Sequence, residues 1–348
     1  MSFRVTEGKK KRLQAVADSR GVIAALAIDQ RNAIKKLFAN AIGCEPNDVP
    51  GEQIVQFKEV VSQVLTPHAS AILLDPEYGL PAAKRKSKKA GLLLAYEKTG
   101  YEKAVPGRLP HLLDRWSASR LVSAGADCVK LLLYYSSTSP ADIVDAKHAF
   151  VERVGAECSE ADVPFFLELV SYAEGLDDKG AEFAKLKPMV VAQGMAEFSQ
   201  PQYRVDVLKV GMPVNLGFVE GAPITAGQTL SNRTEALAHY RAAAAAATVP
   251  FIYLSEGVSN ETFLFGLELA AEAKAPFCGV LCGRATWQDG VPVFVKGGTS
   301  ALEDWLSTTG TRNIENVNQC LKAAQPWFAA VGEATSKKPL RGKGKGHS

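Results

Sequence analysis

Apolar runs recur along the chain at regular intervals, and stretches with the spacing of amphipathic helices separate them. The runs have the β-branched, uninterrupted apolar character of strands that are covered on both faces. Strands and helices that alternate in this way predict a parallel sheet with helices outside it. The eight candidate strands span residues 21–29, 70–75, 91–97, 127–135, 164–170, 205–211, 250–256 and 277–284.

The segment 51–67 shows the helical spacing most clearly. Its apolar residues recur three or four positions apart, which places them on one face of a helix. These residues are Ile54, Phe57, Val61 and Val64. The segment is therefore predicted to be a helix that packs against the sheet.

Four other connecting segments differ in their helix signals. Residues 259–274 begin with Ser259, a residue type that commonly caps a helix start. Residues 232–247 contain an alanine run with strong helix propensity. The segment 81–91 is short and basic, so the second connection is expected to lack a full helix, whereas residues 301–328 are expected to form an extra C-terminal helix.

Eight strand–helix units in a chain of this length fit a (β/α)8 TIM barrel, which typically takes ~250 residues plus insertions. A doubly wound open sheet is the competing architecture, but it usually has a glycine-rich turn after its first strand, where this chain has AIDQRNAIKK. We therefore predict an α/β fold with a single barrel domain at residues 21–330. Residues 1–20 are expected to be a helical lead-in, and residues 331–348 a disordered basic tail.

Composition and charge change this picture little. Of the 348 residues, 47% are hydrophobic and 22% are charged, as in ordinary globular proteins. The formal net charge of +3 arises in the tail, because residues 336–348 contain five cations. The rest of the chain is close to neutral, so no basic face favours nucleic acid as a partner.

The sequence also bears on the cellular compartment. No apolar run approaches the ~18 residues of a transmembrane helix, and the N-terminus lacks the apolar stretch of a secretory signal. Six cysteines occur without CxxC pairing, several of them in strand-like runs, where they resemble small buried hydrophobes. We therefore expect a cytoplasmic protein that does not bind membranes.

Polar and charged residues follow all eight candidate strands. The carboxyl ends of the strands form the active-site mouth of a barrel, so these side chains are expected to converge there. A network of structural salt bridges is the alternative explanation. The set contains Asp29, Gln30 and Arg31, Asp75 and Glu77, Glu97, Lys130, Glu168, Lys209, Ser255 and Glu256, and Gly283 and Arg284.

Alternation along the strands sharpens this expectation. Lys209 interrupts the apolar run VDVLKVG and shares its face with Val205 and Val207. By the same count, Lys130 and Glu168 point inward from strands 4 and 5. Adjacent strands lie ~4.8 Å apart, so Lys130, Glu168 and Lys209 are expected within direct or one-water reach.

A lysine in such a position is suited to covalent chemistry. Burial and a nearby second cation both disfavour the ammonium form and lower the pKa of a lysine. The neutral amine of Lys209 could then attack a ketone and form an imine, while Glu168 moves protons during dehydration and C–C cleavage. A lysine that snorkels from a strand end is the alternative for Lys209, and the matching depth of Lys130 and Glu168 disfavours it.

Two loops predict an anion site. Ser255 and Gly257 follow strand 7, and Gly283 and Arg284 follow strand 8. Barrels often bind phosphate with the backbone N–H groups of these two loops, and Arg284 would add a planar guanidinium. Either loop alone fits a routine turn, but together they favour a phosphorylated substrate.

Metal and cofactor chemistry find little support in the sequence. Most of the five histidines lie in helical or tail segments, and no cluster of His, Asp or Glu has the spacing of metal ligands. GxSxG, P-loop and GxGxxG motifs do not occur. We therefore expect neither a metal nor a cofactor.

The strand-end segments together resemble the tagatose-1,6-bisphosphate aldolases of the class I, Schiff-base type. The resemblance extends over roughly residues 20–330 and rests on AIDQR, LLDPEYG, VKLLLYY, FFLELVSY, VLKVGMPVN and GVLCGRATW, among others. It implies a lyase that reversibly cleaves D-tagatose 1,6-bisphosphate into dihydroxyacetone phosphate and D-glyceraldehyde 3-phosphate without a metal. Barrels of this type commonly dimerise, so a homodimer is expected.

The resemblance also implies roles for individual residues. It makes Lys209 the Schiff-base lysine and Glu168 the general acid and base, while Lys130 orients the substrate and lowers the pKa of Lys209. The other implied residues are Asp29, Gln30 and Arg31 for substrate binding, and Ser255, Gly257, Gly283 and Arg284 for phosphate binding.

Several alternatives stay open at this point. An aldolase for fructose 1,6-bisphosphate or for 6-deoxy-6-sulfofructose 1-phosphate would use the same mechanism. A deoxyribose-phosphate-type aldolase would accept a single phosphate, whereas the charged groups after strand 1 favour a larger, doubly anionic substrate. A non-catalytic sugar-phosphate sensor is expected to keep the anion site and lose the Lys/Glu pair, yet Lys130, Glu168 and Lys209 are all present.

Overall fold

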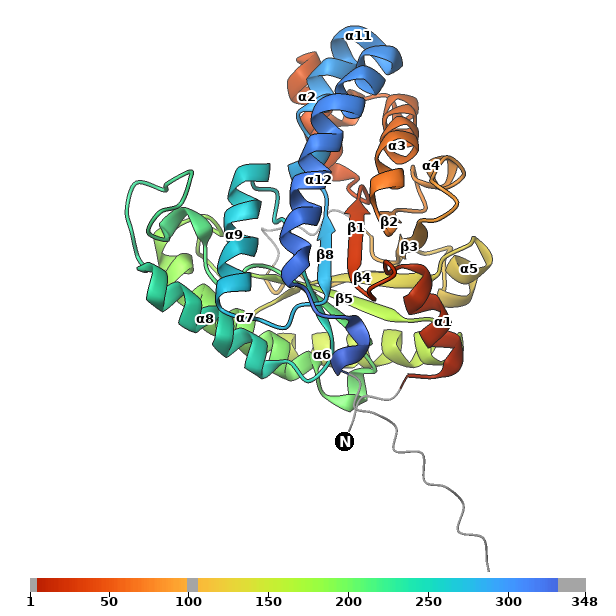
Figure 1. The fold of residues 1–348 in the computed structure, drawn as a ribbon. Coiled ribbons are helices and arrows are strands. Elements are labelled where there is room, and N and C mark those ends of the chain that lie inside the picture. Colours follow the sequence, from red (N-terminus) through yellow and green to blue (C-terminus); the bar gives the residue numbers. More distant parts are fainter. Residues whose placement is uncertain (1–4, 99–105, 331–348) are drawn as a thin grey trace, which may run out of the picture.

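A closed ring of eight parallel strands forms the centre of the computed structural model, which describes residues 5–98 and 106–330 (Figure 1). Each strand pairs with its neighbour in sequence, and β1 pairs with β8 to close the ring. The predicted (β/α)8 barrel is confirmed, and the doubly wound sheet is excluded. The strands are β1 (Ile23–Ala27), β2 (Ala71–Leu74), β3 (Gly91–Ala95), β4 (Cys128–Tyr135), β5 (Phe165–Ser171), β6 (Val207–Val210), β7 (Phe251–Leu254) and β8 (Gly279–Cys282).

Helices surround the ring, and the predicted helix start at Ser259 is confirmed, because Ser259 accepts a hydrogen bond from the backbone N–H of Thr262. A capping box between Asn232 and Glu235, which was not predicted, begins α8. The second connection has only the single turn α4, as the basic segment predicts. The helices are α1 (Glu7–Ala15), α2 (Asn32–Ile42), α3 (Gly51–Leu65), α4 (Leu80–Ala83), α5 (Ala118–Ser123), α6 (Ala141–Glu160), α7 (Ala181–Phe198), α8 (Arg233–Ala246), α9 (Asn260–Glu272), α10 (Arg284–Trp287), α11 (Gly290–Trp305) and α12 (Thr311–Cys320).

The single helix expected over residues 301–328 is wrong in its continuity, and it misses the first part of α11. α11 starts at Gly290 but is kinked at Gly298, whose backbone is not helical, so its second part begins close to the predicted start. A turn of π-helix joins α11 to α12, and short 3₁₀ turns follow. Sequence reasoning misses the start because glycine and proline are poor helix formers. Burial of Val291 and Phe294 in the core stabilises this segment as helix despite its composition.

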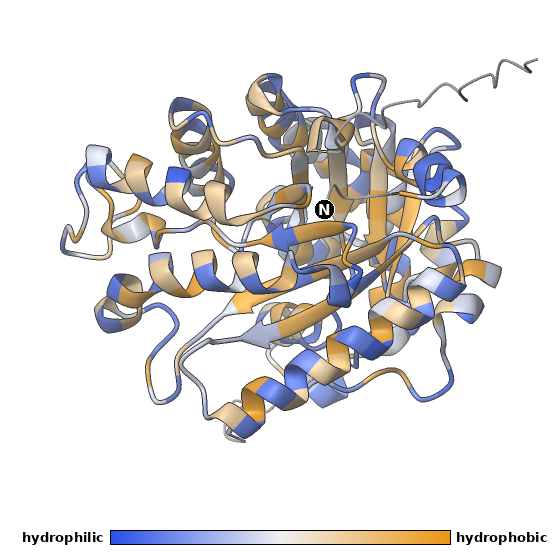
Figure 2. Cartoon of the chain, turned by 90° about the horizontal axis from the view of Figure 1, so that it is seen from below, coloured by the Kyte–Doolittle hydropathy of each residue, from blue (hydrophilic) through white to orange (hydrophobic). Residues whose placement is uncertain are grey.

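Strand side chains alternate between two apolar layers. Figure 2 shows the apolar strands at the centre and polar residues on the outer faces of the surrounding helices. The inner layer fills the barrel and contains Phe166, Val207 and Ile252. Val207 therefore lies inward, as alternation predicts, but Val205 belongs to the outer layer because β6 begins only at Val207.

The two ends of the described chain close the amino-terminal end of the barrel. Leu13 and Val16 of the α1 region pack with Trp327 against the inner layer. The backbone N–H of Trp327 donates to the Gly21 carbonyl at 2.9 Å, which ties the C-terminal segment to the start of β1. This plug leaves the carboxyl ends of the strands as the mouth of the barrel.

Two further observations concern the chain as a whole. All six cysteines are free thiols. Within residues 5–98 and 106–330, no helix is both long and apolar enough to cross a membrane. The basic tail predicted at residues 331–348 lies outside the described residues.

Candidate active site

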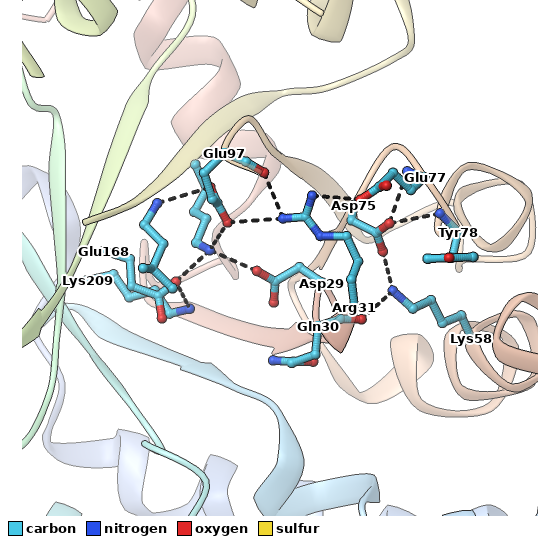
Figure 3. Close-up of polar contacts among 12 residues, drawn as sticks. Asp29, Gln30, Arg31, Lys58, Asp75, Glu77, Tyr78, Glu97, Glu168 and Lys209 are labelled. Carbon is cyan, nitrogen blue, oxygen red and sulfur yellow. Dashed lines mark hydrogen bonds and ion pairs between the residues drawn. The ribbon is translucent and has the colours of Figure 1, made fainter. Parts of the chain in front are cut away.

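Lys130, Glu168 and Lys209 meet inside the mouth of the barrel. The Nζ of Lys209 donates to Oε2 of Glu168 at 2.7 Å (Figure 3), and the Nζ of Lys130 lies 2.8 Å from the same oxygen. Glu168 and Lys209 are paired directly across β5 and β6. All three residues are buried. One carboxylate oxygen therefore bridges the two lysines that alternation predicts to converge.

Lys130 lies among three carboxylates. Its Nζ donates to Asp29 Oδ2 at 2.9 Å and to Glu97 Oε1 at 2.8 Å, and it also contacts Glu168. Burial would lower the pKa of Lys130, but these carboxylates outweigh it and raise the pKa well above its ordinary value. Lys130 is therefore a fixed cation at neutral pH.

Glu97 has a larger part in the site than its sequence signal indicates. Besides Lys130, it accepts a hydrogen bond from the Leu132 backbone N–H at 3.0 Å. The sequence marks it only as a charged residue at a strand end. Its position two residues beyond Ala95, the last residue of β3, is the signal that could have identified it as inward-facing.

Asp29 and Glu168 are held as carboxylates. Burial would raise the pKa of each group, but the cations Lys130 and Lys209 outweigh it, so both pKa values lie below the ordinary range. Among the described residues, Asp29 Oδ1 is buried without a hydrogen-bond partner. This oxygen is a ready acceptor for a hydroxyl group of a bound molecule.

The two residues after Asp29 differ in how readily their side chains can bind a ligand. Arg31 donates to Glu77 at 3.0 Å and to the Glu97 carbonyl at 2.8 Å, so its terminal nitrogens are already engaged (Figure 3). The Oε1 of Gln30 is buried without a partner in the part of the chain that the structure describes. Gln30 is thus free to bind a ligand, whereas Arg31 could do so only by giving up a protein contact or through its Nε.

A second buried ion pair lies beside the site and was not predicted. Lys58 of α3 pairs with Asp75, and it also donates to the Gln30 carbonyl at 3.0 Å. Asp75 accepts further bonds from the backbone N–H groups of Glu77 and Tyr78. The spacing of Lys58 from Ile54, on the buried face of α3, could have revealed it.

The loops after β7 and β8 bring Gly257 and Arg284 together. Gly257 has a φ of 77°, and a Cβ at this position would lie 2.4 Å from the guanidinium carbon of Arg284. Glycine is therefore required both for the backbone conformation and for the close approach. A Cβ on Gly283 would lie 2.8 Å from the Ala27 carbonyl oxygen, so this position is tightly packed as well.

Arg284 is a cation of the mouth that is available to an anionic ligand. No hydrogen bond or ion pair joins its half-buried side chain to any other described residue. Burial lowers the pKa of Arg284, against the opposing effect of Glu168 and Asp29. Ser255, which is buried, directly follows the neighbouring strand β7. These observations fit an anion site, since a half-buried guanidinium without a partner is unfavourable.

Glu256 differs from the other charges at the strand ends. Its carboxylate accepts hydrogen bonds from Lys187 of α7 at 2.8 and 2.9 Å and from the Met212 backbone N–H at 3.3 Å. It has a φ of 49°, which is uncommon outside glycine. Glu256 therefore holds α7 against the barrel wall and is not part of the network around Lys209.

The arrangement suits carbonyl chemistry. It combines a primary amine, a carboxylate that can move protons at 2.7 Å from it, and a fixed ammonium group. Arg284 can hold an anionic substituent of the same molecule. Residues 5–98 and 106–330 contain no group of three or more His, Cys, Asp or Glu side chains placed to hold a metal ion.

Comparisons with known proteins agree with this chemistry. A family model described as DeoC/LacD family aldolase matches residues 23–289. Tagatose 1,6-diphosphate aldolase 2 of Enterococcus faecalis is 53% identical over 94% of this chain and 98% of its own length. The tagatose 1,6-diphosphate aldolase of Listeria monocytogenes is 46% identical over 94% of this chain and 96% of its own.

A solved structure adds a likeness in fold. A Schiff base forming fructose-1,6-bisphosphate aldolase superposes with a TM-score of 0.51 at 14% sequence identity. The match covers 86% of this chain and 98% of the solved one. At this identity the likeness concerns the barrel architecture alone.

Proposed function

The chain belongs to the DeoC/LacD family of aldolases, and from this premise we propose that it is a class I aldolase. It cleaves D-tagatose 1,6-bisphosphate reversibly into dihydroxyacetone phosphate and D-glyceraldehyde 3-phosphate through a Schiff base on Lys209. The observation that carries this proposal is the contact between the buried amine of Lys209 and the carboxylate that it shares with Lys130. The intact trio disfavours a non-catalytic sensor.

The reaction begins with attack of the Lys209 amine on the C2 ketone of the open-chain sugar. Glu168 takes a proton from the Lys209 nitrogen, which frees the amine for attack, and then gives this proton to the departing hydroxyl group, so that water leaves and a protonated imine forms. Glu168, again a carboxylate, then takes the proton of the C4 hydroxyl group as the C3–C4 bond breaks. The electron pair of that bond moves into the iminium group, which leaves an enamine on Lys209 and releases glyceraldehyde 3-phosphate.

The second half of the reaction regenerates the free amine. Protonation of the enamine at C3 gives the imine of dihydroxyacetone phosphate, and water then releases this product from Lys209. The cation Lys130 stabilises the negative charge that develops on oxygen during these steps. Glu168 is suited to these proton transfers because it lies 2.7 Å from the nitrogen that forms the imine.

The remaining residues bind the substrate in this proposal. The unpartnered oxygens of Asp29 and Gln30 accept hydrogen bonds from sugar hydroxyl groups. Arg284 binds the phosphate nearest the ketone. The backbone of Ser255, Gly257 and Gly283 completes the phosphate site, because the glycines allow the chain to approach the anion closely.

Borohydride trapping tests the proposal. Incubation with dihydroxyacetone phosphate and borohydride in the presence of EDTA is expected to leave one reduced adduct, located by mass spectrometry on Lys209. Rates on the 1,6-bisphosphates of tagatose and fructose and on 6-deoxy-6-sulfofructose 1-phosphate then rank the substrates. An adduct on Lys130, or no adduct at all, would contradict the assignment of Lys209.

We propose further that the protein is a cytoplasmic homodimer. Six free thiols, four of them buried, suit a reducing compartment. Light scattering on the purified protein measures the mass of the assembly, and cell fractionation tests the compartment. A monomeric mass or a secreted protein would contradict this part of the proposal.

A further inference from the structure

A second buried arginine lies at the mouth, on the side of β4 and β5. The guanidinium carbon of Arg108 lies 4.2 Å from the centre of the Tyr172 ring and 5.1 Å from that of Tyr134. Arg108 is only 6% exposed and has a φ of 42°, a conformation that costs energy for a residue other than glycine. Close packing between two aromatic rings holds the side chain in place.

Strand geometry places this arginine beyond the catalytic carboxylate. Tyr134 stands four residues after Lys130 on β4, and Tyr172 stands four residues after Glu168, just beyond the end of β5. An even spacing keeps side chains on one face of a strand, and four residues advance ~13 Å along it. The two rings contact each other with centroids 6.2 Å apart, so both lie on this face. Arg108 therefore lies further out than the reacting amine.

Arg108 is weakly engaged by the protein. Its terminal nitrogens lie 3.4 and 3.5 Å from the carboxylate of Asp178, which is longer than the usual range of ~2.7–3.2 Å. Its Nε is buried and has no hydrogen-bond partner among the described residues. Arg31, by contrast, holds its partners at 2.8 and 3.0 Å. Of the two buried arginines, Arg108 is the one that can accept a new anion at little cost.

A buried lysine that contacts the same tyrosine ring adds positive charge near Arg108. Lys147 of α6 donates to the hydroxyl group of Tyr172 at 3.0 Å and lies 4.8 Å from the centre of its ring. Burial lowers the pKa of Lys147 to about 8, so a large fraction of this amine is still charged at neutral pH. The acidic groups nearby are Asp178, partly exposed, and Glu174, which accepts from the Gly107 backbone N–H at 2.8 Å.

We propose that Arg108 binds the phosphate at the far end of the substrate from the ketone and so selects bisphosphates over ketose 1-phosphates. The inference rests on the proposed function, which fixes the ketone at Lys209 and the nearer phosphate at Arg284. The six-carbon chain then carries its second phosphate outward along the mouth. There the dianion displaces Asp178 and forms paired hydrogen bonds with the guanidinium.

Paired substrates test the inference. Steady-state rates are measured for Arg108→Met with D-tagatose 1,6-bisphosphate and with D-tagatose 1-phosphate, which lacks the distal phosphate. KM for the bisphosphate is expected to rise by about 10- to 100-fold, the size of a lost hydrogen bond to a charged group. KM for the monophosphate is expected to change by less than about twofold. Arg115→Met, at an exposed arginine, is the matched control and should change neither value.

A conservative variant covers the case in which Arg108→Met folds poorly. Arg108→Lys keeps the charge and loses the planar fork, so its KM for the bisphosphate should fall between those of the wild type and Arg108→Met. An unchanged KM for the bisphosphate in both variants would overturn the inference. So would equal rises of KM for both substrates, because a purely structural role affects them alike.

Trapping separates this inference from the proposed function. Dihydroxyacetone phosphate has no distal phosphate, so its borohydride adduct on Lys209 should form equally in the wild type and in Arg108→Met. Failure to trap the wild type would defeat the proposed function itself. Equal trapping together with an unchanged KM for the bisphosphate would defeat only the role of Arg108.

Discussion

Two buried lysines of this barrel, Lys58 and Lys130, have opposite electrostatic balances. Lys58 has one carboxylate, Asp75, and neither side chain is exposed. Its burial outweighs that single partner and lowers the pKa of Lys58. Lys130 has three carboxylates, which together outweigh its burial and raise its pKa. Burial of a lysine therefore does not by itself indicate its role or its charge.

The surroundings of Lys58 and those of Lys130 differ more clearly in whether their polar groups already have all their hydrogen-bond partners. The Lys58–Asp75 pair is complete, because backbone groups satisfy both members. In the network around Lys209 two lysines share one oxygen of Glu168, and Asp29 keeps a buried oxygen without a partner in the described structure. A complete pair stabilises the fold, whereas shared and unpartnered groups leave capacity for a substrate.

The largest expected effect separates the two regions by activity. Lys209→Met is expected to lower kcat/KM by roughly 10⁴-fold or more, because no other group supplies the nucleophile. Its borohydride adduct should vanish in mass spectra. Lys58→Met, a change of an equally buried lysine, should still form the adduct. A borohydride adduct on the Lys209→Met protein would contradict the difference between the two regions. So would the absence of an adduct on a folded Lys58→Met protein.

The next effect separates the regions by stability. Asp75→Asn leaves the charge of Lys58 buried without its partner and is expected to cost about 3–5 kcal/mol of unfolding free energy in urea titrations. The double variant Lys58→Met with Asp75→Asn should recover most of this loss. Asp114→Asn breaks an exposed pair with Lys98 and should cost only ~0–1 kcal/mol. A small loss of unfolding free energy in Asp75→Asn would contradict the strong stabilisation that we assign to this buried ion pair.

Glu168→Gln tests the shared carboxylate. It keeps the shape of the side chain and removes its proton transfer, so kcat is expected to fall by about 10²- to 10³-fold. KM should change much less, since Glu168 acts on the reacting atoms. Slow trapping of dihydroxyacetone phosphate on Lys209 should persist. An effect confined to KM would assign Glu168 to substrate binding instead.

The smallest effect concerns acid stability. The pKa of Asp29 lies below its ordinary value of 3.8 in the folded protein, so the unfolded chain binds more protons around that pH. Its contribution to stability is present above pH ~4 and is lost as the pH falls through the lowered pKa. In wild-type protein the unfolding free energy falls with decreasing pH below pH 5, and Asp29→Asn should reduce the slope of this fall by up to about 1.4 kcal/mol per pH unit. Urea titrations from pH 3 to 7 measure this slope, and an unchanged slope would contradict the pairing with Lys130.

The eight strands were predictable because they are uninterrupted apolar runs, and the convergence on Lys209 was predictable because side chains alternate along a strand. Lys130, Glu168 and Lys209 occupy alternate positions in long apolar strands, so their direction could be counted from the sequence. The same count from Ala95 indicates the direction of Glu97, but not its contact with Lys130. The position of Arg108 could not be counted, because it depends on packing against Tyr134 and Tyr172.

The contacts that helices make with other elements were also hard to predict from the sequence. The pattern in α3 predicts which face is buried, but it does not show that Lys58 on that face meets Asp75 from another element. The early start of α11 depends on contacts of Val291 and Phe294 with the core, which outweigh its local propensity. Pairing between distant segments is the information that local periodicity lacks.

The plug formed by α1 and Trp327 continues into the packed inner layer of Phe166, Val207 and Ile252, so the interior of the barrel is filled up to the level of Lys209. Water and protons therefore reach the Lys209 amine only through the open mouth, by the route that a substrate takes. A molecule bound in the mouth would for this reason exclude bulk water from the amine.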